Sequence, residues 1–184
     1  DSEIDYYVDF AGSASVTTAG SPIPTADGAE FSVEAWVKPD TISAFNAIIS
    51  QGQTRFGAAN RFWLGFSDVD GDYFIHIGRS ATGWAYSSIS NPIGRWVHVA
   101  ATVANNDEIK IYLDGQLLDT LSLGNGGTVS GFGIGSDEDG SGNRFDGQID
   151  QVKIWDGVLE ASEVLASMHT LGAPAGVSGL RAHY

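Results

Sequence analysis

Apolar and polar residues alternate along several short segments of the chain. In residues 31–37, Phe31, Val33, Ala35 and Val37 fall on one face. A period of two is the pattern of a half-buried β-strand, because successive side chains of a strand point to opposite faces. Comparable segments recur at residues 61–66, 73–77, 95–103, 108–113 and 116–121. The chain is therefore expected to be rich in short strands.

Turn-forming residues separate these segments. Asp70-Gly71, Asp114-Gly115 and Asn105-Asn106-Asp107 each stand between two of them. Asp, Asn and Gly tolerate the positive φ that tight hairpins need. A helical pattern is confined to residues 159–168. Many short strands and one late helix predict an all-β fold, an antiparallel two-sheet jelly-roll sandwich that forms one domain over residues 1–184.

The amino-acid composition excludes several classes of function. The 184 residues include no cysteine, which excludes disulfides, thiolate zinc sites and cysteine nucleophiles. The net charge of −14 argues against binding to nucleic acid or to an anionic membrane. No apolar run reaches the roughly 18 residues of a membrane span. Of the 23 acidic residues 16 are Asp, many beside Gly or Asn, where calcium ligands are usually found.

The first residues, Asp1-Ser2-Glu3, include neither an initiator Met nor a signal peptide. We therefore expect a mature protein or a piece of a longer one. The absence of cysteine is compatible with export from a bacterium, where disulfides are optional. An extracellular or cell-surface location is expected.

Three segments resemble motifs of a known family. Residues 31–37 resemble its FTVEAWV strand, and residues 94–100 followed by 111–115 resemble GxWHHVA…LYVDG. Residues 145–155 and the helical segment after them resemble FxGxIDEVRIW…LSxEEI. In this order they are similar to the laminin-G-like, concanavalin-A-like jelly rolls, which include the pentraxins. The resemblance runs from residue 6 to about residue 170 and implies two antiparallel sheets, often with a calcium-dependent ligand site on a rim or concave face. It does not imply catalysis, because this fold carries many functions.

The resemblance also implies calcium binding in the acidic loop 135–143. Calcium takes six to eight oxygen ligands, and a Gly-rich loop can supply both carboxylates and carbonyls. The equivalent loop of the pentraxins holds calcium. By this likeness Asp137 and Asp139 are side-chain ligands and Glu138 contributes its carbonyl oxygen. The alternative is an acidic loop that is simply solvated.

Further ligands in the pentraxins come from the residues before the strand matching 61–66. Here these are Ala59 and Asn60, and only Asn60 carries a suitable side-chain oxygen. A further pentraxin acid has no clear counterpart because the loop is shorter in this chain. We expect Asn143 or Asp146 to take its place.

Two other acidic clusters are weaker candidates. The segment 68–72, Asp-Val-Asp-Gly-Asp, begins like an EF-hand loop but lacks the remainder, so a hairpin turn with solvated acids is favoured. Asp5, Asp9 and Asp150 could share a structural calcium. Alternatively, Asp150 forms a hydrogen bond with the backbone.

Aromatic side chains suit sugar binding, because a ring stacks on the apolar face of a pyranose. Trp63 lies opposite the apolar face of its strand, so we expect Trp63 and Arg61 to project onto an accessible surface. Trp84, Tyr86 and His76 are further candidates. The alternative is that these rings cover edges of the core. The predicted ligand site consists of Asn60, Arg61, Trp63, Trp84 and Asn143.

No catalytic motif is present. Retaining glycosidases of this fold use a Glu-x-Asp-x-x-Glu strand, and the comparable segment 148–152 lacks both Glu residues. His98 is expected to be a hydrogen-bonded histidine within a sheet. The chain is therefore not expected to be an enzyme.

The function expected from these features is calcium-dependent carbohydrate binding. The chain would be a lectin module of a secreted or cell-surface adhesin, acting as a monomeric domain of a larger protein. Two alternatives remain open. One is a structural spacer or protein-binding domain of the adhesin, and the other is an accessory module of a polysaccharide-degrading enzyme.

The last six residues alternate again and resemble the GLxAHY strand with which laminin-G-like domains begin. Two arrangements of residues 177–184 are possible. They begin a following domain, or they pair beside the N-terminal strand and complete this sheet. The second is favoured, because an unpaired sheet edge promotes aggregation.

Overall fold

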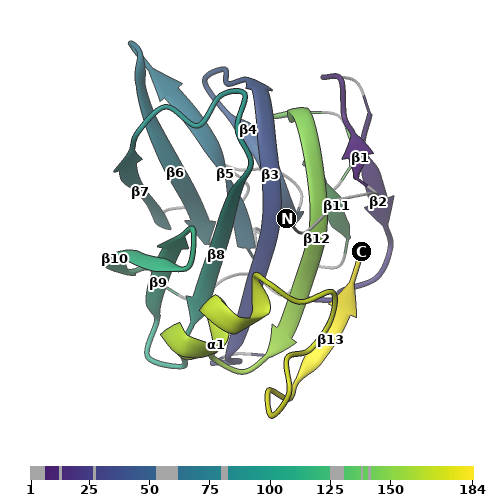
Figure 1. Ribbon diagram of the computed structural model, residues 1–184, viewed down its shortest axis with the longest axis vertical. Coiled ribbons are helices and arrows are strands. Elements are labelled where there is room, and N and C mark those ends of the chain that lie inside the picture. The colour runs from purple at the N-terminus through teal and green to yellow at the C-terminus, as the bar shows by residue number, and fades with distance from the viewer. Residues whose placement is uncertain are drawn as a thin grey trace.

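The structure is a computed structural model that describes residues 7–12, 14–26, 28–52, 62–79, 83–124, 131–137, 139–140 and 142–184. Within these residues the chain forms thirteen β-strands and one α-helix, arranged as two sheets that face each other (Figure 1). The predicted all-β sandwich with one late helix is confirmed.

The first sheet has seven strands in the order β1-β12-β3-β8-β9-β10, and β13 also pairs with β12. These strands are β1 (Val8–Asp9), β12 (Asp146–Asp156), β3 (Phe31–Thr41), β8 (Val97–Val103), β9 (Glu108–Leu113), β10 (Gln116–Ser122) and β13 (Leu180–His183).

The second sheet has six strands in the order β2-β11-β4-β5-β6-β7. These strands are β2 (Val16–Thr18), β11 (Phe132–Ile134), β4 (Asn46–Gln51), β5 (Phe62–Val69), β6 (Asp72–Arg79) and β7 (Gly83–Ile89). All strand pairs of both sheets are antiparallel.

The hairpin turns follow the predicted turn residues. Asp70 and Gly71 join β5 to β6 with φ of 56° and 89°, and Asp114 and Gly115 join β9 to β10 with φ of 49° and 74°. A two-residue turn with positive φ at both positions matches the twist of the strands it joins. The segment 68–72 is therefore a hairpin, in which the backbone N–H of Gly71 donates to Asp68 Oδ1 at 2.9 Å.

The core lies between the two sheets and is built from the alternating positions. Phe31, Val33, Ala35 and Val37 of β3 have no exposed surface. They pack in one continuous cluster with residues of the opposite sheet, including Phe62, Leu64, Phe66, Ile75 and Ile77. The faces of β5 and β6 that point away from this cluster are the ones available for other roles.

Alternation does not predict β2, β4, β7 or β11. Every residue of β4 is buried, so this strand has no exposed polar face to reveal a period of two. β2 and β11 have three residues each, too few for a periodic pattern. Only the pairing of β11 between β2 and β4 identifies these short segments as strands.

The helix α1 (Ala161–Ser167) lies across the outer face of the seven-stranded sheet (Figure 1). It is shorter than the predicted segment 159–168. Glu160 and Glu163 form a capping box that satisfies backbone N–H groups at its first turn. Leu159 and Val164 pack with Trp155 and two other residues of the sheet, Ala100 and Tyr112.

The C-terminal segment forms the strand that its alternation predicts. β13 pairs with β12 around Ile154, whereas β1 pairs with β12 at Ile149. Because β3 occupies the other side of β12, β1 and β13 share one edge of it. The ring of Tyr184 stacks on Phe132 of the other sheet, with centroids 5.6 Å apart.

Candidate functional site

A groove of about 380 Å³ lies on the outer face of the six-stranded sheet. We call it the aromatic groove. Its lining comes from the segment before β4 and from β5, β6 and β7, and consists of Phe45, Ser67, Val69, Phe74, His76, Trp84 and Tyr86.

The period of two positions this lining. In β6, Ile75 and Ile77 belong to the core, so Phe74 and His76 point to the opposite side of the sheet. Strand pairing then places His76 beside Tyr86 of β7. The groove is thus assembled across neighbouring strands rather than along one of them.

His76 is the centre of the aromatic groove. Four aromatic rings surround its imidazole at centroid distances of 5.1 Å (Trp84), 5.4 Å (Phe45), 5.9 Å (Tyr86) and 6.0 Å (Trp63). The side chain of His76 is 7% exposed, whereas Tyr86 is 63% exposed. Tyr86 therefore offers the accessible ring surface, and His76 forms part of the floor.

Two glycines make room for the indole rings. A Cβ atom at Gly78 would come within 2.6 Å of the Trp84 ring, to which Gly78 is paired across β6 and β7. A Cβ atom at Gly65 would come within 2.5 Å of the Trp63 ring. Each indole occupies space beside a position that has no side chain, and Trp84 thereby reaches the lining of the groove.

Trp63 corrects one expectation from the sequence. It does lie on the face opposite the core residues of β5, but it is 1% exposed and does not project onto the surface. Its ring is covered on one side by His76 and Trp84, and its Nε1–H donates to Asp137 Oδ1 at 3.1 Å. Alternation determines the face on which a side chain lies but not what covers that face.

Asp137 links the acidic loop to the aromatic groove through Trp63. Its carboxylate is 3% exposed and also accepts a hydrogen bond from Asn143 Nδ2, at 2.9 Å. The loop closes locally, because the N–H of Gly140 donates to the carbonyl oxygen of Asp137 at 2.8 Å. Ser50 Oγ of β4 donates to the carbonyl oxygen of Ser136 at 2.9 Å and anchors the loop to the sheet.

This arrangement bears on calcium binding. Both carboxylate oxygens of Asp137 already accept N–H donors, so calcium there would have to share those oxygens. Asp139 is exposed, and within the described residues no three Asp, Glu, His or Cys side chains gather into a potential metal site. Three predicted residues, Asn60, Arg61 and Glu138, lie outside the described residues. The calcium site stays a prediction.

The remaining acidic candidates have local roles in the structure. Asp150 Oδ1 accepts the N–H of Gln151 at 2.8 Å, as the backbone alternative predicted, and burial raises the pKa of Asp150. Asp9 Oδ1 accepts the N–H of Ala11 at 3.0 Å. Asp5 lies outside the described residues. Asp146 Oδ2 accepts a hydrogen bond from Thr41 Oγ1 at 2.7 Å.

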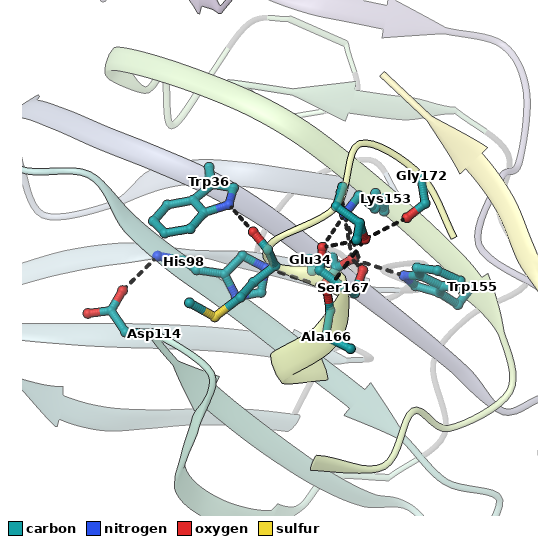
Figure 2. Close-up of polar contacts among 11 residues, drawn as sticks. Glu34, Trp36, His98, Asp114, Lys153, Trp155, Ala166, Ser167 and Gly172 are labelled. Carbon is teal, nitrogen blue, oxygen red and sulfur yellow. Dashed lines mark hydrogen bonds and ion pairs between the residues drawn. The ribbon is translucent and has the colours of Figure 1, made fainter. Parts of the chain in front are cut away.

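A second polar cluster lies on the other sheet, beneath α1, and involves Glu34, His98 and Lys153 (Figure 2). Glu34 Oε2 is 3.2 Å from His98 Nε2, and Glu34 Oε1 is 3.3 Å from Lys153 Nζ. Trp155 Nε1 and Ser167 Oγ also donate to Glu34 Oε1. His98 thus has a partner within the sheet, as its sequence context predicted.

The same cluster fastens the end of α1. Lys153 Nζ donates to the carbonyl oxygens of Ser167 at 2.7 Å and Thr170 at 2.8 Å, and Trp36 Nε1 donates to that of Met168 at 2.9 Å (Figure 2). Ser167 ends the helix and Met168 and Thr170 follow it, so these carbonyls lie where no N–H of a further helical turn remains to bind them. Lys153 therefore completes the hydrogen bonding of the helix end.

Burial and neighbouring charges shift the pKa values of Glu34 and Lys153 in opposite directions. Burial alone would raise the pKa of Glu34, but the hydrogen bond and charge of His98, together with Lys153, outweigh it and hold the pKa below its usual value. For Lys153 burial dominates and lowers the pKa despite the attraction of Glu34. Glu34, His98 and Lys153 are each 1% exposed, so a substrate in solution does not reach them. The cluster is structural.

Four residues of the groove lining were not predicted as candidates for the ligand site: Phe45, Ser67, Val69 and Phe74. Phe74 alternates away from the core residues of β6, a signal that was available, and its ring meets Tyr86 edge-on at 5.3 Å. Phe45 precedes β4 in a segment without periodicity. Only the folded arrangement brings Phe45 to His76.

Comparison with known proteins agrees with this fold. Residues 10–165 match the family model described as the concanavalin A-like lectin/glucanases superfamily, and the chain belongs to this family. No curated protein matches the sequence. Among the described residues, no helix has the length and apolar character needed to cross a bilayer.

Solved structures with the same fold have low sequence identity to this chain. The heptameric SAP-like pentraxin of Limulus polyphemus is 22% identical, with a TM-score of 0.62, 74% of this chain and 68% of that chain covered. Domain 4 of AbnA, a GH43 extracellular arabinanase of Geobacillus stearothermophilus in complex with arabinotriose, is 22% identical, with a TM-score of 0.60 and coverage of 80% and 69%. The CBM40 of the Ruminococcus gnavus IT-sialidase, bound to α2,3-sialyllactose, is 18% identical, with a TM-score of 0.61 and coverage of 75% and 82%.

Proposed function

We propose that this domain binds carbohydrate and that the sugar occupies the aromatic groove. The observation that carries the proposal is the gathering of aromatic rings around His76, with Tyr86 exposed at the surface. Membership of a lectin and glucanase superfamily supports the same conclusion. So do the similar structures, two of which contain bound oligosaccharides.

In this proposal sugar rings stack on aromatic rings. The C–H groups on one face of a pyranose or furanose present an apolar surface, and the exposed face of Tyr86 matches it. Trp84 lines the adjoining part of the groove, and the hydroxyl of Ser67 is a polar group that can orient a sugar hydroxyl. An apolar pocket with few convergent polar groups is the usual form of such a site.

The proposed activity is binding without catalysis. Glycoside hydrolysis by the common mechanisms needs two carboxyl groups on either side of the scissile bond. In the described part of the chain, no carboxylate side chain lines the aromatic groove. Glu34 is buried beneath α1 on the other sheet.

We further propose that binding depends on calcium held by the acidic loop at residues 135–143. Three consecutive acids at residues 137–139 and the structural likeness to a pentraxin support this proposal. The hydrogen bond from Trp63 to Asp137 connects a calcium ion bound at the loop to the aromatic groove. Calcium at this loop would change the position of Asp137 and, through it, the indole that lies beside Trp84 and His76.

The proposed setting is a secreted or cell-surface adhesin, in which this chain is one monomeric domain. The acidic, cysteine-free composition supports an exported protein. In that setting the function is adhesion to a glycan or polysaccharide.

A glycan array, with calcium and with EDTA, tests the proposal, and calorimetry then measures the affinity for the best glycan. Replacing Tyr86 or Trp84 by Ala should weaken binding roughly 10- to 30-fold, because an aromatic contact at the centre of an interface is worth about 1.4–2 kcal/mol. The matched control is Tyr7→Ala. Tyr7 is 48% exposed and lies against Trp96, outside the groove, so its loss should leave the affinity unchanged.

Three results would contradict parts of this proposal. If no glycan binds, the domain is a spacer or a protein-binding domain. If Tyr86→Ala and Trp84→Ala bind as tightly as the wild type, the sugar occupies another surface. If EDTA has no effect on a glycan that binds, the calcium dependence is wrong and the groove assignment stands.

A further inference from the structure

Positive charge in this domain is scarce and largely paired. Of the nine Lys and Arg residues, all but Arg55 and Arg61 lie in the described part of the chain. Five of these seven lie 2.9–3.7 Å from a carboxylate. The pairs are Arg79 with Asp107, Arg95 with Asp114, Lys110 with Glu108, Lys153 with Glu34 and Arg181 with Asp156.

The two remaining described cations do not line the groove. Lys38 belongs to β3 of the seven-stranded sheet, and Arg144 precedes β12. Among the residues that the structure describes, the lining of the aromatic groove consists of aromatic, aliphatic and hydroxyl side chains and one histidine. At its end near Val69, the β5–β6 turn adds two exposed carboxylates, Asp70 and Asp72.

A carboxylated sugar would meet unfavourable electrostatics here. Its carboxylate would lose hydration on entering an apolar groove, and such a loss is offset only by a cation or by several N–H donors. Asp70 and Asp72 at the rim and a net charge of −14 would add repulsion. A neutral sugar incurs neither cost and keeps the full benefit of stacking.

We infer that the aromatic groove selects neutral glycans and rejects glycans that carry carboxylates. This inference rests on the proposed function and narrows it to a substrate class. The similar structures leave the choice open, because arabinotriose is neutral whereas sialyllactose is acidic. The charges of the described residues around this groove favour the neutral class.

The experiment compares two panels on the same protein by calorimetry in low-salt buffer. The neutral panel contains gluco-, xylo-, manno-, arabino- and galacto-oligosaccharides. The acidic panel contains oligogalacturonate, alginate oligosaccharides and α2,3-sialyllactose. Two matched pairs isolate the charge: oligogalacturonate against its methyl ester, and sialyllactose against its methyl ester. Where either member of a pair binds, the neutral one should bind more tightly by roughly tenfold or more.

A charge placed in the groove should reverse part of this preference. Val69 lines the groove and is 53% exposed, so Val69→Lys should strengthen binding of the acidic panel several-fold. The matched control is Leu171→Lys, because Leu171 is 79% exposed and lies outside the groove lining. Both variants change the net charge equally, so a gain confined to Val69→Lys identifies the groove as the site of discrimination.

The possible results separate the inference from the function on which it rests. If the tightest binder belongs to the acidic panel, or an acid binds as tightly as its neutral partner, the inference is overturned and carbohydrate binding stands. If no member of either panel binds, the proposed function itself fails. If a neutral glycan binds most tightly and Val69→Lys strengthens binding of the acidic panel, the inference holds.

Discussion

Glu34 lies at a position of β3 that alternation directs away from the core between the sheets, and it is nevertheless 1% exposed. α1 and the segment after it cover this position and supply Ser167 as a partner, while β12 supplies Lys153. A buried pair of this kind contributes little net stability, because both ions lose their hydration on burial. Removing one partner is costly, since the other charge is left buried alone.

We therefore expect Glu34→Gln to lower the free energy of unfolding at neutral pH by about 3–5 kcal/mol, measured by urea denaturation. The control is Glu108→Gln, which breaks an exposed pair with Lys110 and should cost about 1 kcal/mol or less. If the two variants have equal stability, Glu34 is not an essential partner of Lys153.

This difference should also depend on pH. The pKa of Glu34 is held below its ordinary value of 4.5 in the folded state, so the stability that Glu34 contributes is fully present above that value. As the pH falls through the lowered pKa, Glu34 takes up a proton in the wild type and comes to resemble Gln. The stability gap between wild type and Glu34→Gln should therefore narrow below pH 4.5. A gap that is constant down to about pH 3 would contradict this mechanism.

Among the elements, β13 together with its flanking residues contacts three parts of the fold. It covers an edge of β12, Val177 and Leu180 pack on the cluster beneath α1, and Tyr184 stacks on Phe132 of the other sheet. β13 and its flanking residues Val177 and Tyr184 thus join a sheet edge, the cluster beneath α1 and the opposite sheet. An edge strand so covered is protected from pairing with other molecules.

Deleting residues 177–184 should lower the melting temperature by several degrees, since about 1 kcal/mol corresponds to roughly 2–4 °C in a domain of this size. It should also promote association, visible by light scattering, because the edge of β12 becomes accessible. Arg181→Ala is the control, because it removes only the exposed pair with Asp156 and should leave melting nearly unchanged. A truncated domain that stays monomeric and equally stable would show that β13 does not support this fold.

For the whole molecule, the dominant electrostatic quantity is the net charge of −14. Mutual repulsion of this size opposes the compact state, and a bound cation relieves part of it. The acidic loop is also connected to the core, because Asp137 accepts the indole N–H of the buried Trp63. Calcium bound at this loop would therefore change the stability of the entire fold.

If calcium binds only the folded state, it should stabilise the protein by about 2.7 kcal/mol at a hundredfold excess over Kd. Calorimetric melting with calcium and with EDTA measures this. Asp139→Asn should abolish most of the calcium effect, and it should lower the stability in EDTA less than Asp137→Asn does, because Asp139 is exposed whereas Asp137 is buried. Asp137→Asn should lower stability even in EDTA, because it removes a buried acceptor.

Asp70→Asn is the control for the acidic loop. It conserves the turn, because Asn tolerates the positive φ of this position, and it should leave the calcium effect intact. If EDTA does not change the melting temperature, the calcium proposal is wrong. If only Asp70→Asn abolished the stabilisation by calcium, the calcium site would lie in the β5–β6 hairpin and not in the acidic loop.

The sequence by itself determined the features that depend only on residues close together in the chain. The period of two in residues 31–37 and 108–113 placed their strands, and Asp-Gly pairs with positive φ placed two hairpin turns. The motifs at residues 31–37, 94–115 and 145–155 identified the family. These features are local because side-chain alternation and turn geometry are properties of a few consecutive residues.

Only the tertiary structure decided which side chains meet and which remain accessible. Trp63 and Tyr86 both point to the outer face of the same sheet, yet one is 1% and the other 63% exposed. Phe45 reaches His76 from a segment that carries no pattern, and Glu34 and Lys153 meet only because β12 pairs beside β3 under α1. Strand order and the covering of each face depend on contacts between residues far apart in the chain, and alternation within one strand carries no information about them.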